Sequence, residues 1–127
     1  MTAQLSFELV ADEFNTAEMI LLEAKGQEVF HRVSGVIARV ALERHLFTVA
    51  DQRGIVITVN PPHKKKPEAQ DAIVSLRKAG AITAIQQSQL ETLFKIGNNC
   101  AHPQEIIDPA DIEKIIKDGK QLASIIL

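Results

Sequence analysis

One stretch of helical periodicity is longer than any other in this sequence. From Gln27 to Gln52 apolar residues recur at steps of three and four, the spacing that places side chains on one face of an α-helix. The apolar residues of this stripe are Phe30, Val33, Ile37, Val40, Ala41, Phe47 and Ala50. The other face carries four charged residues, namely Arg32, Arg39, Glu43 and Arg44. Of these, Arg39 and Glu43 form an i,i+4 pair of opposite charge. We therefore predict that residues 27–52 form the longest helix and that the apolar stripe faces the core.

Capping signals predict further helices on both sides of this stretch. An Asn or Thr cap predicts a short helix over residues 15–25, which Gly26 would end. Pro67 fits the first turn of a helix over residues 67–78, ended by Gly80 as the residue after the C-cap.

Two capping-box patterns follow, Thr83 with Gln86 and Ser88 with Glu91. We expect the second box to start a helix with four residues on its apolar face, namely Leu90, Leu93, Phe94 and Ala101. The last helix is predicted to begin at Asp108, a capping residue followed by Pro109, and to run to about Ile126. Its apolar stripe is Ile112, Ile115, Ile116, Leu122 and Ile126.

The β-branched run at residues 55–59 favours a short extended segment, but one strand without a partner makes a poor sheet. Residues 60–67, with two adjacent prolines and three adjacent lysines, are typical of a loop. The sequence therefore predicts an all-α fold, a bundle of about five helices in a single domain spanning residues 1–127.

Composition and charge exclude several functional classes. The chain has no Trp, no Tyr and five Phe, too few rings for a protein that stacks single-stranded nucleic acid on aromatic side chains. Its net charge of −2 argues against a dominant phosphate-binding surface. Cys100 is the only cysteine, so we expect no intramolecular disulfide and a cytoplasmic protein. No apolar run approaches the ~18 residues of a membrane span.

The densest polar cluster is the run from Lys95 to Pro103. A Gly followed by two Asn is a poor helix-forming sequence, so something other than helix propensity favours these residues there. One interpretation is structural: Gly97 allows another helix to approach closely, and His102 lies at the negative end of the helix dipole.

A second interpretation comes from a family resemblance. An apolar helix, Ile-Gly-Asn-x-x-Ala-His-Pro at residues 96–103, Asp-Pro-Ala-Asp at 108–111 and another apolar helix occur in that order. This order resembles the HEPN-like helical domains, in particular the group with a Gly-Asn-x-x-Ala-His signature that is often met beside restriction and phage-defence genes. The upstream run from Ala38 to Glu43 is similar to that group's Ala-Arg-x-x-Leu-Glu helix. The resemblance covers about residues 15–126.

The resemblance implies a site and a partner. In active HEPN ribonucleases an Arg, a polar residue after it and a His a few positions on form the site, and two copies face each other in a dimer. His102 matches the His, and Asn98 or Asn99 matches the polar residue. The Arg is not matched: Lys95 is the nearest cation, and Phe94 is the other residue that can occupy the arginine's position.

Two functional hypotheses follow. The first is a non-catalytic or degenerate HEPN-like module that forms a homodimer and serves a prokaryotic defence or toxin–antitoxin type system, with a protein partner from the same operon. The second is a metal-independent endoribonuclease in which His102 transfers protons while Asn98, Asn99 and Lys95 assist. Whether the protein is an enzyme is left open between them.

Other candidate sites are weaker. Lys64, Lys65 and Lys66 are a candidate RNA contact, although a solvated loop is the favoured interpretation. We expect no cofactor and no metal, because Cys100 and His102 lack further ligands at a suitable spacing. Cys100 itself is expected to be a small buried thiol rather than a nucleophile. His45 is expected at the surface or at its boundary.

Overall fold

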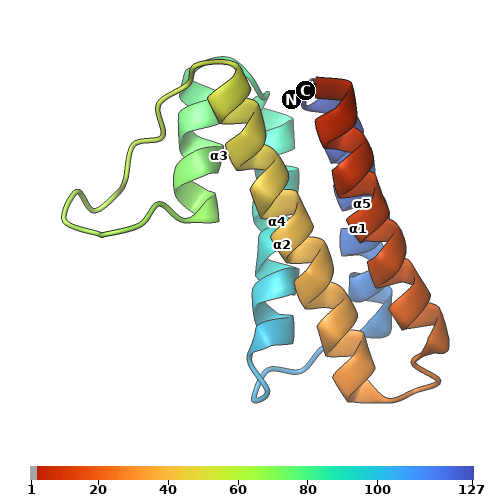
Figure 1. Ribbon diagram of the computed structural model, residues 1–127. Coiled ribbons are helices and arrows are strands. Elements are labelled where there is room, and N and C mark those ends of the chain that lie inside the picture. The colour runs from red at the N-terminus through yellow and green to blue at the C-terminus, as the bar shows by residue number, and fades with distance from the viewer. Residues whose placement is uncertain (1–2) are drawn as a thin grey trace.

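The computed structural model describes the backbone of residues 3–127 and the side chains from Phe7 onward. The described residues form five helices in a bundle: α1 (Ala3–Glu23), α2 (Glu28–Gln52), α3 (Ala69–Lys78), α4 (Ala84–Ala101) and α5 (Pro109–Ile125). Figure 1 shows α1 and α5 on one side of α2, with α3 and α4 on the other. The predicted all-α, five-helix fold is confirmed.

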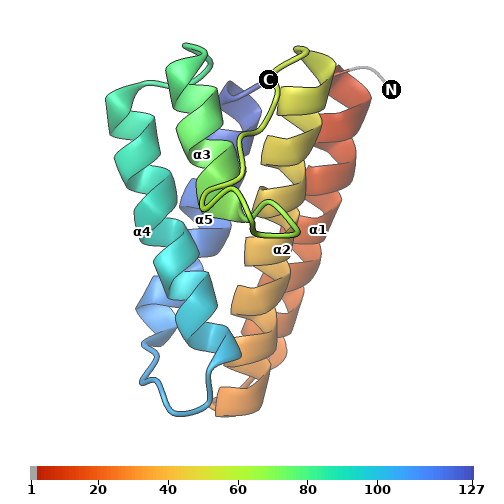
Figure 2. The same cartoon turned by 90° about the vertical axis from the view of Figure 1, so that its left-hand side faces the viewer.

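Helix α2 lies at the centre of the bundle and packs against each of the other four helices. Figure 2 shows the end of α4 close to the start of α2 at the lower end of the molecule, the two helices diverging above, and α3 and the segment before it in front of them. The buried apolar side chains are aliphatic apart from Phe14, Phe94 and Cys100. No described helix is long and apolar enough to cross a membrane.

The buried face of α2 matches the predicted stripe only in part: Ala41 and Ala50 are buried, and Ile37 and Phe47 pack partly against the core. The face in the core consists mostly of small residues with a few large ones, namely Ser34, Gly35, Ala38, Ala41, Leu42, His45, Leu46, Val49 and Ala50. Phe30, Val33 and Val40 of the predicted stripe remain 44%, 41% and 38% exposed. Helix α2 is apolar on two faces, and the neighbouring helices cover the face whose small residues let them approach closely.

Helix α1 begins at Ala3 rather than at Asn15. Thr16 does not cap a helix: its hydroxyl donates to the carbonyl of Asp12, four residues earlier in the same helix. The apolar spacing continues upstream, since Val10 and Phe14 are buried like Ala17. The prediction of a helix start at residues 15–16 was therefore wrong. Ser and Thr also occur inside helices, where their hydroxyls bond to a carbonyl of the preceding turn.

Helix α4 starts at the first of the two capping boxes. The Thr83 hydroxyl accepts a hydrogen bond from the backbone of Gln86 at 3.1 Å, and the Gln86 side chain accepts one from the backbone of Thr83 at 2.9 Å. The expectation that Ser88 begins this helix was wrong. Ala101 is exposed rather than on the apolar face, whereas Leu90, Leu93 and Phe94 are buried as predicted.

Side-chain caps and a glycine set the start of α5 and both ends of α3. The Asp108 side chain accepts from the backbone of Ala110 at 2.9 Å and caps α5, as predicted. Helix α3 starts at Ala69, two residues after Pro67, because Glu68 and Asp71 form a capping box. Gly80 follows its C-cap with φ +78°, a conformation that favours glycine.

Residues 55–59 pair with no strand, and the part of the chain described here contains none. Their side chains alternate between half-buried and exposed, with Val56 84% exposed. Helix α3 holds the segment through side chains: Ser75 accepts from the Thr58 backbone at 3.0 Å, and Asp71 accepts from the Asn60 backbone at 3.1 Å.

His45 is buried in the core rather than at the surface, where the sequence placed it. Its Nε2 lies 2.6 Å from the carbonyl oxygen of Ile126, and its buried Nδ1 has no hydrogen-bond partner. Burial lowers the pKa of His45 from its usual 6.5, an effect that its backbone hydrogen bonds at Ile126 and Ala123 partly oppose. Folding therefore favours the neutral form of the ring.

We predict that His45 makes stability depend on pH in the weakly acidic range. Below pH ~6.5 the unfolded chain takes up a proton that the folded chain does not, so the unfolding free energy falls by at most about 1.4 kcal/mol per pH unit until the folded pKa is reached. Urea unfolding at pH 7, 6 and 5 should show this slope in the wild type and lose it in His45→Gln. His63→Gln, in an exposed loop, should keep the slope, and equal slopes in wild type and His45→Gln would contradict the assignment.

Candidate functional site at helices α2 and α4

Helices α2 and α4 cross at two glycines. A Cβ at Gly35 would overlap the Sγ of Cys100, and a Cβ at Gly97 would lie 2.6–2.8 Å from the Cβ, Cγ and Cδ of Arg39. Each glycine therefore accommodates a side chain of the facing helix, which allows the two backbones to come close. The structural interpretation of Gly97, that it permits a close approach of another helix, is confirmed.

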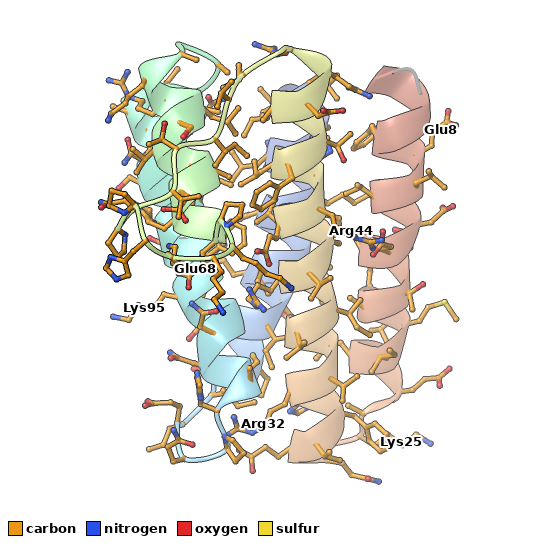
Figure 3. The ribbon with its side chains drawn as sticks, turned by 60° about the vertical axis from the view of Figure 1, so that its left-hand side comes forward. Glu8, Lys25, Arg32, Arg44, Glu68 and Lys95 are labelled. Atoms are coloured by element: carbon orange, nitrogen blue, oxygen red, sulfur yellow. The ribbon has the colours of Figure 1, made fainter. Side chains whose placement is uncertain are left out.

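Arg32 fixes the end of α4 and the loop that follows it. Its guanidinium donates to the carbonyls of Asn99 at 3.0 Å and His102 at 2.9 Å, and it also binds Glu28 at 2.9 Å. Further hydrogen bonds reach the carbonyls of Pro103 and Glu105. A helix C-terminus leaves its last carbonyls without partners, and this cation supplies donors where the dipole is negative. Figure 3 shows Arg32 beside the loop at this end of α4.

The predicted site residues line one groove of about 710 Å³. Lys95, Asn98, Asn99 and His102 come from α4 and its C-cap, and they face Arg39 and Glu43 on α2. The remaining lining residues come from the start of α3 and from α4, namely Glu68, Ala69, Gln70, Glu91 and Phe94. Figure 3 shows Lys95 and Glu68 on the same side of the molecule.

The charges in this groove nearly balance. Arg39 binds Glu43 at 3.2 Å, with both side chains about a quarter exposed. Glu91 accepts a hydrogen bond from Gln70 at 2.7 Å, and Glu68 lies 3.5 Å from Lys64. The lining therefore contains three carboxylates against two fixed cations, Arg39 and Lys95. Such a groove does not concentrate positive charge as a polyanion-binding site does.

The lysine run is divided between two environments. Lys64 binds Asp71 at 2.7 Å, and the hydrogen bond that its ammonium donates to this carboxylate raises the pKa of Lys64. Hydrogen bonds from the Glu68 backbone and then from Lys64 lower the pKa of Asp71. Lys64 therefore holds the α2–α3 loop against α3, whereas Lys65 and Lys66 are exposed. As an RNA contact, the run offers two accessible amines rather than three.

Cys100 is a buried thiol in the α2–α4 crossing, 3% exposed. Burial raises its pKa, and the nearby charges of Arg32 and Asp111 act in opposite directions. A thiol with a raised pKa is a poor nucleophile. Within residues 3–127 no group of three or more His, Cys, Asp or Glu side chains is placed to hold a metal ion.

Sequence reasoning did not predict the contacts that two arginines of α2 make with α4 and with the loop after it. Arg39 was assigned to a charged helix face as a partner of Glu43, yet it places a guanidinium in the same groove as His102. Arg32 was assigned to the same charged face, yet it binds the loop after α4. The spacing of charges along α2 does not contain this information, because both contacts are made with residues about 60–70 positions away in the chain.

Comparisons with known proteins do not identify the chain. No family model matches it, and neither a curated protein nor a solved structure does.

We predict that the Gly35 and Cys100 positions are energetically coupled. In Gly35→Ala, overpacking should lower the free energy of unfolding by about 1–3 kcal/mol. The higher helix propensity of alanine should offset up to ~1 kcal/mol of this loss. Gly35→Ala combined with Cys100→Ala should recover stability, because the second change removes the overlapping sulfur. Urea unfolding of the four proteins measures the coupling, and additive effects of the two substitutions would contradict the close packing described here.

Proposed function

We propose that this chain is a non-catalytic, HEPN-like interaction module that forms a homodimer and binds a further protein, in a prokaryotic defence or toxin–antitoxin type system. The observation that carries the proposal is the second apolar face of α2, on which Val29, Val33 and Val40 are exposed while Val36 and Phe47 pack partly against the core. The family and system named here rest on the resemblance of residues 96–111 and of the Ala38–Glu43 run.

This partly exposed face of α2 has the spacing of a helix-pairing surface. We call Val29, Val33, Val36, Val40 and Phe47 the α2 seam; successive members are four, three, four and seven residues apart. An alternation of three and four residues keeps side chains along one line of a helix that pairs with another. Val29, Val33 and Val40 are 60%, 41% and 38% exposed.

A second copy of the chain is the partner that this face favours. Apolar surface gains roughly 25 cal/mol for each Å² removed from water, and two seams brought together cover each other. A two-fold axis places the same patch on both subunits, so a stripe along one straight helix can pair with itself. The ion pair between Arg44 and Glu13 lies beside the seam and ties α1 to α2 there.

The charge balance of the α4 groove supports a role without catalysis. RNA cleavage without a metal needs cationic donors for the charge that develops on the phosphate. Arg39 is already paired with Glu43, and Lys95 is a single ammonium rather than a bidentate guanidinium. Glu68 and Glu91 would in addition repel a phosphodiester backbone.

The ribonuclease remains the second candidate because one observation favours it. The four residues that the resemblance selects, Lys95, Asn98, Asn99 and His102, line a single groove, and Arg39 brings a guanidinium from α2 into it. In this alternative His102 would transfer the proton, and Arg39 would supply the cation that the α4 motif lacks.

We predict that negative charge in the α2 seam prevents self-association. Val33→Asp combined with Val40→Asp should convert a dimer into a monomer, because two carboxylates on each subunit would have to leave water. Light scattering at micromolar concentration measures the mass, and circular dichroism checks the fold. Val56→Asp is the matched control, since Val56 is 84% exposed and lies outside the seam. A wild-type monomer, or a double variant that still dimerises, would refute the assigned surface.

We predict that purified protein does not cleave RNA in the presence of EDTA. A panel of labelled single-stranded and structured RNAs should remain intact with the wild type and with His102→Ala alike. Cleavage by the wild type that His102→Ala abolishes and His63→Ala preserves would instead establish the ribonuclease and overturn the non-catalytic assignment.

A further inference from the structure

A charged residue interrupts the α2 seam. Between Val40 and Phe47 the alternation of three and four residues falls on Glu43, which therefore lies along the same line of the helix. Its carboxylate binds Arg39 at 3.2 Å, and its side chain is 27% exposed. The part of the seam without a charge is therefore the run from Val29 to Val40, about 17 Å or three helical turns long.

The position of Glu43 distinguishes the two ways in which α2 can pair with a copy of itself. In a parallel pair in register, each seam position faces its own counterpart, so two Glu43 carboxylates would meet in the interface. Like charges held together away from water disfavour such a pair. In an antiparallel pair about a two-fold axis, each seam position faces a different residue, and Glu43 need not meet its counterpart.

One antiparallel register uses all four valines. With the two-fold axis between Val33 and Val36, these two residues face each other across the interface, and Val29 faces Val40. Glu43 then lies beyond the last pair of valines, where it can keep its contact with water and with Arg39. Moving the axis one helical turn toward Phe47 would instead place Glu43 opposite Val33, an apolar residue that offers the carboxylate no partner.

The rest of the fold favours the same register. Helix α3 and the loop before it lie at the level of the half of α2 that ends at Gln52 (Figures 1 and 2). An axis between Val33 and Val36 lies in the other half of α2. The loop and α3 of the two copies would therefore be at opposite ends of the dimer and would not collide. The seam is also most exposed in this half, since Val29 is 60% exposed whereas Phe47 packs partly against the core.

From these features we infer that the α2 seam binds a second copy of this chain in antiparallel orientation. Val29 packs against Val40 of the second copy, and Val33 packs against Val36. The inference rests on the proposed function, because it specifies how the proposed homodimer is built.

Two double variants test which residues face each other. In Val29→Lys with Val40→Glu, each lysine would face a glutamate of the second copy, so light scattering should still detect a dimer. In Val29→Lys with Val40→Lys, like charges would meet, and the dissociation constant of the dimer should be at least about tenfold higher than in the first variant. In a parallel dimer both variants would bring like charges together and would dissociate to the same extent. Circular dichroism checks that both variants fold.

Spin labels test the orientation directly. Asp51 is exposed in the last turn of α2, so labels on Asp51→Cys in the two copies should lie about 50 Å apart. Labels on Lys25→Cys, which is exposed before the start of α2, should lie about 30 Å apart. A parallel pair in register would give less than about 20 Å at both positions. The control is the wild type treated with the same label, because its one cysteine, Cys100, is buried.

The outcomes separate this inference from the proposed dimer. A wild type that stays monomeric in light scattering would overturn both. A dimer with short distances at both labelled positions, or with equal dissociation of the two double variants, would overturn the antiparallel arrangement and leave the α2 dimer in place. A dimer that Val33→Asp combined with Val40→Asp does not dissociate would place the contact elsewhere and overturn both.

Discussion

The close crossing of α2 and α4 is the contact on which the rest of the structure depends. Gly35 leaves room for the Cys100 sulfur, and Gly97 leaves room for the stem of Arg39. Without these two positions the helices would have to separate by the width of a side chain, and the small residues of α2 would no longer fill the core. The same crossing brings Arg39 into the groove that contains His102, so packing and the candidate site share one cause.

Elements defined by local chemistry were predictable from the sequence, and those defined by tertiary contact were not. Asp108 and Pro109 specify the start of α5, because the cap acts on neighbouring backbone groups. For α4 the sequence contained two capping boxes, and local chemistry did not show that the box of Thr83, rather than that of Ser88, starts the helix. The buried face of α2 was predicted only in part: Ala41 and Ala50 are buried, whereas Val33 and Val40 are exposed. The periodicity of a helix that is apolar on two faces cannot distinguish the face in the core from the face at the surface. His45 illustrates the same limit: its burial depends on the carbonyl of Ile126, at the far end of the chain.

The candidate site also combines residues that a local sequence pattern groups with residues that only tertiary contacts bring together. Lys95, Asn98, Asn99 and His102 are close in sequence on one helix and its cap, so a local pattern sufficed to group them. Arg39, Glu43 and Glu68 join them only through folding, and they decide the electrostatic character of the groove. A motif read along α4 therefore finds the polar residues but misses the carboxylates that oppose phosphate binding.

The anchoring by Arg32 has a consequence for interpreting genetic variants. One guanidinium joins the first turn of α2 to the last turn of α4 and to the loop beyond it, so the backbone at His102 is positioned by a residue that does not line the groove. Loss of Arg32 would free several carbonyls at once and let the backbone at His102 move. A phenotype caused by an Arg32 substitution would thus report on the geometry of the site rather than on a chemical role of that arginine.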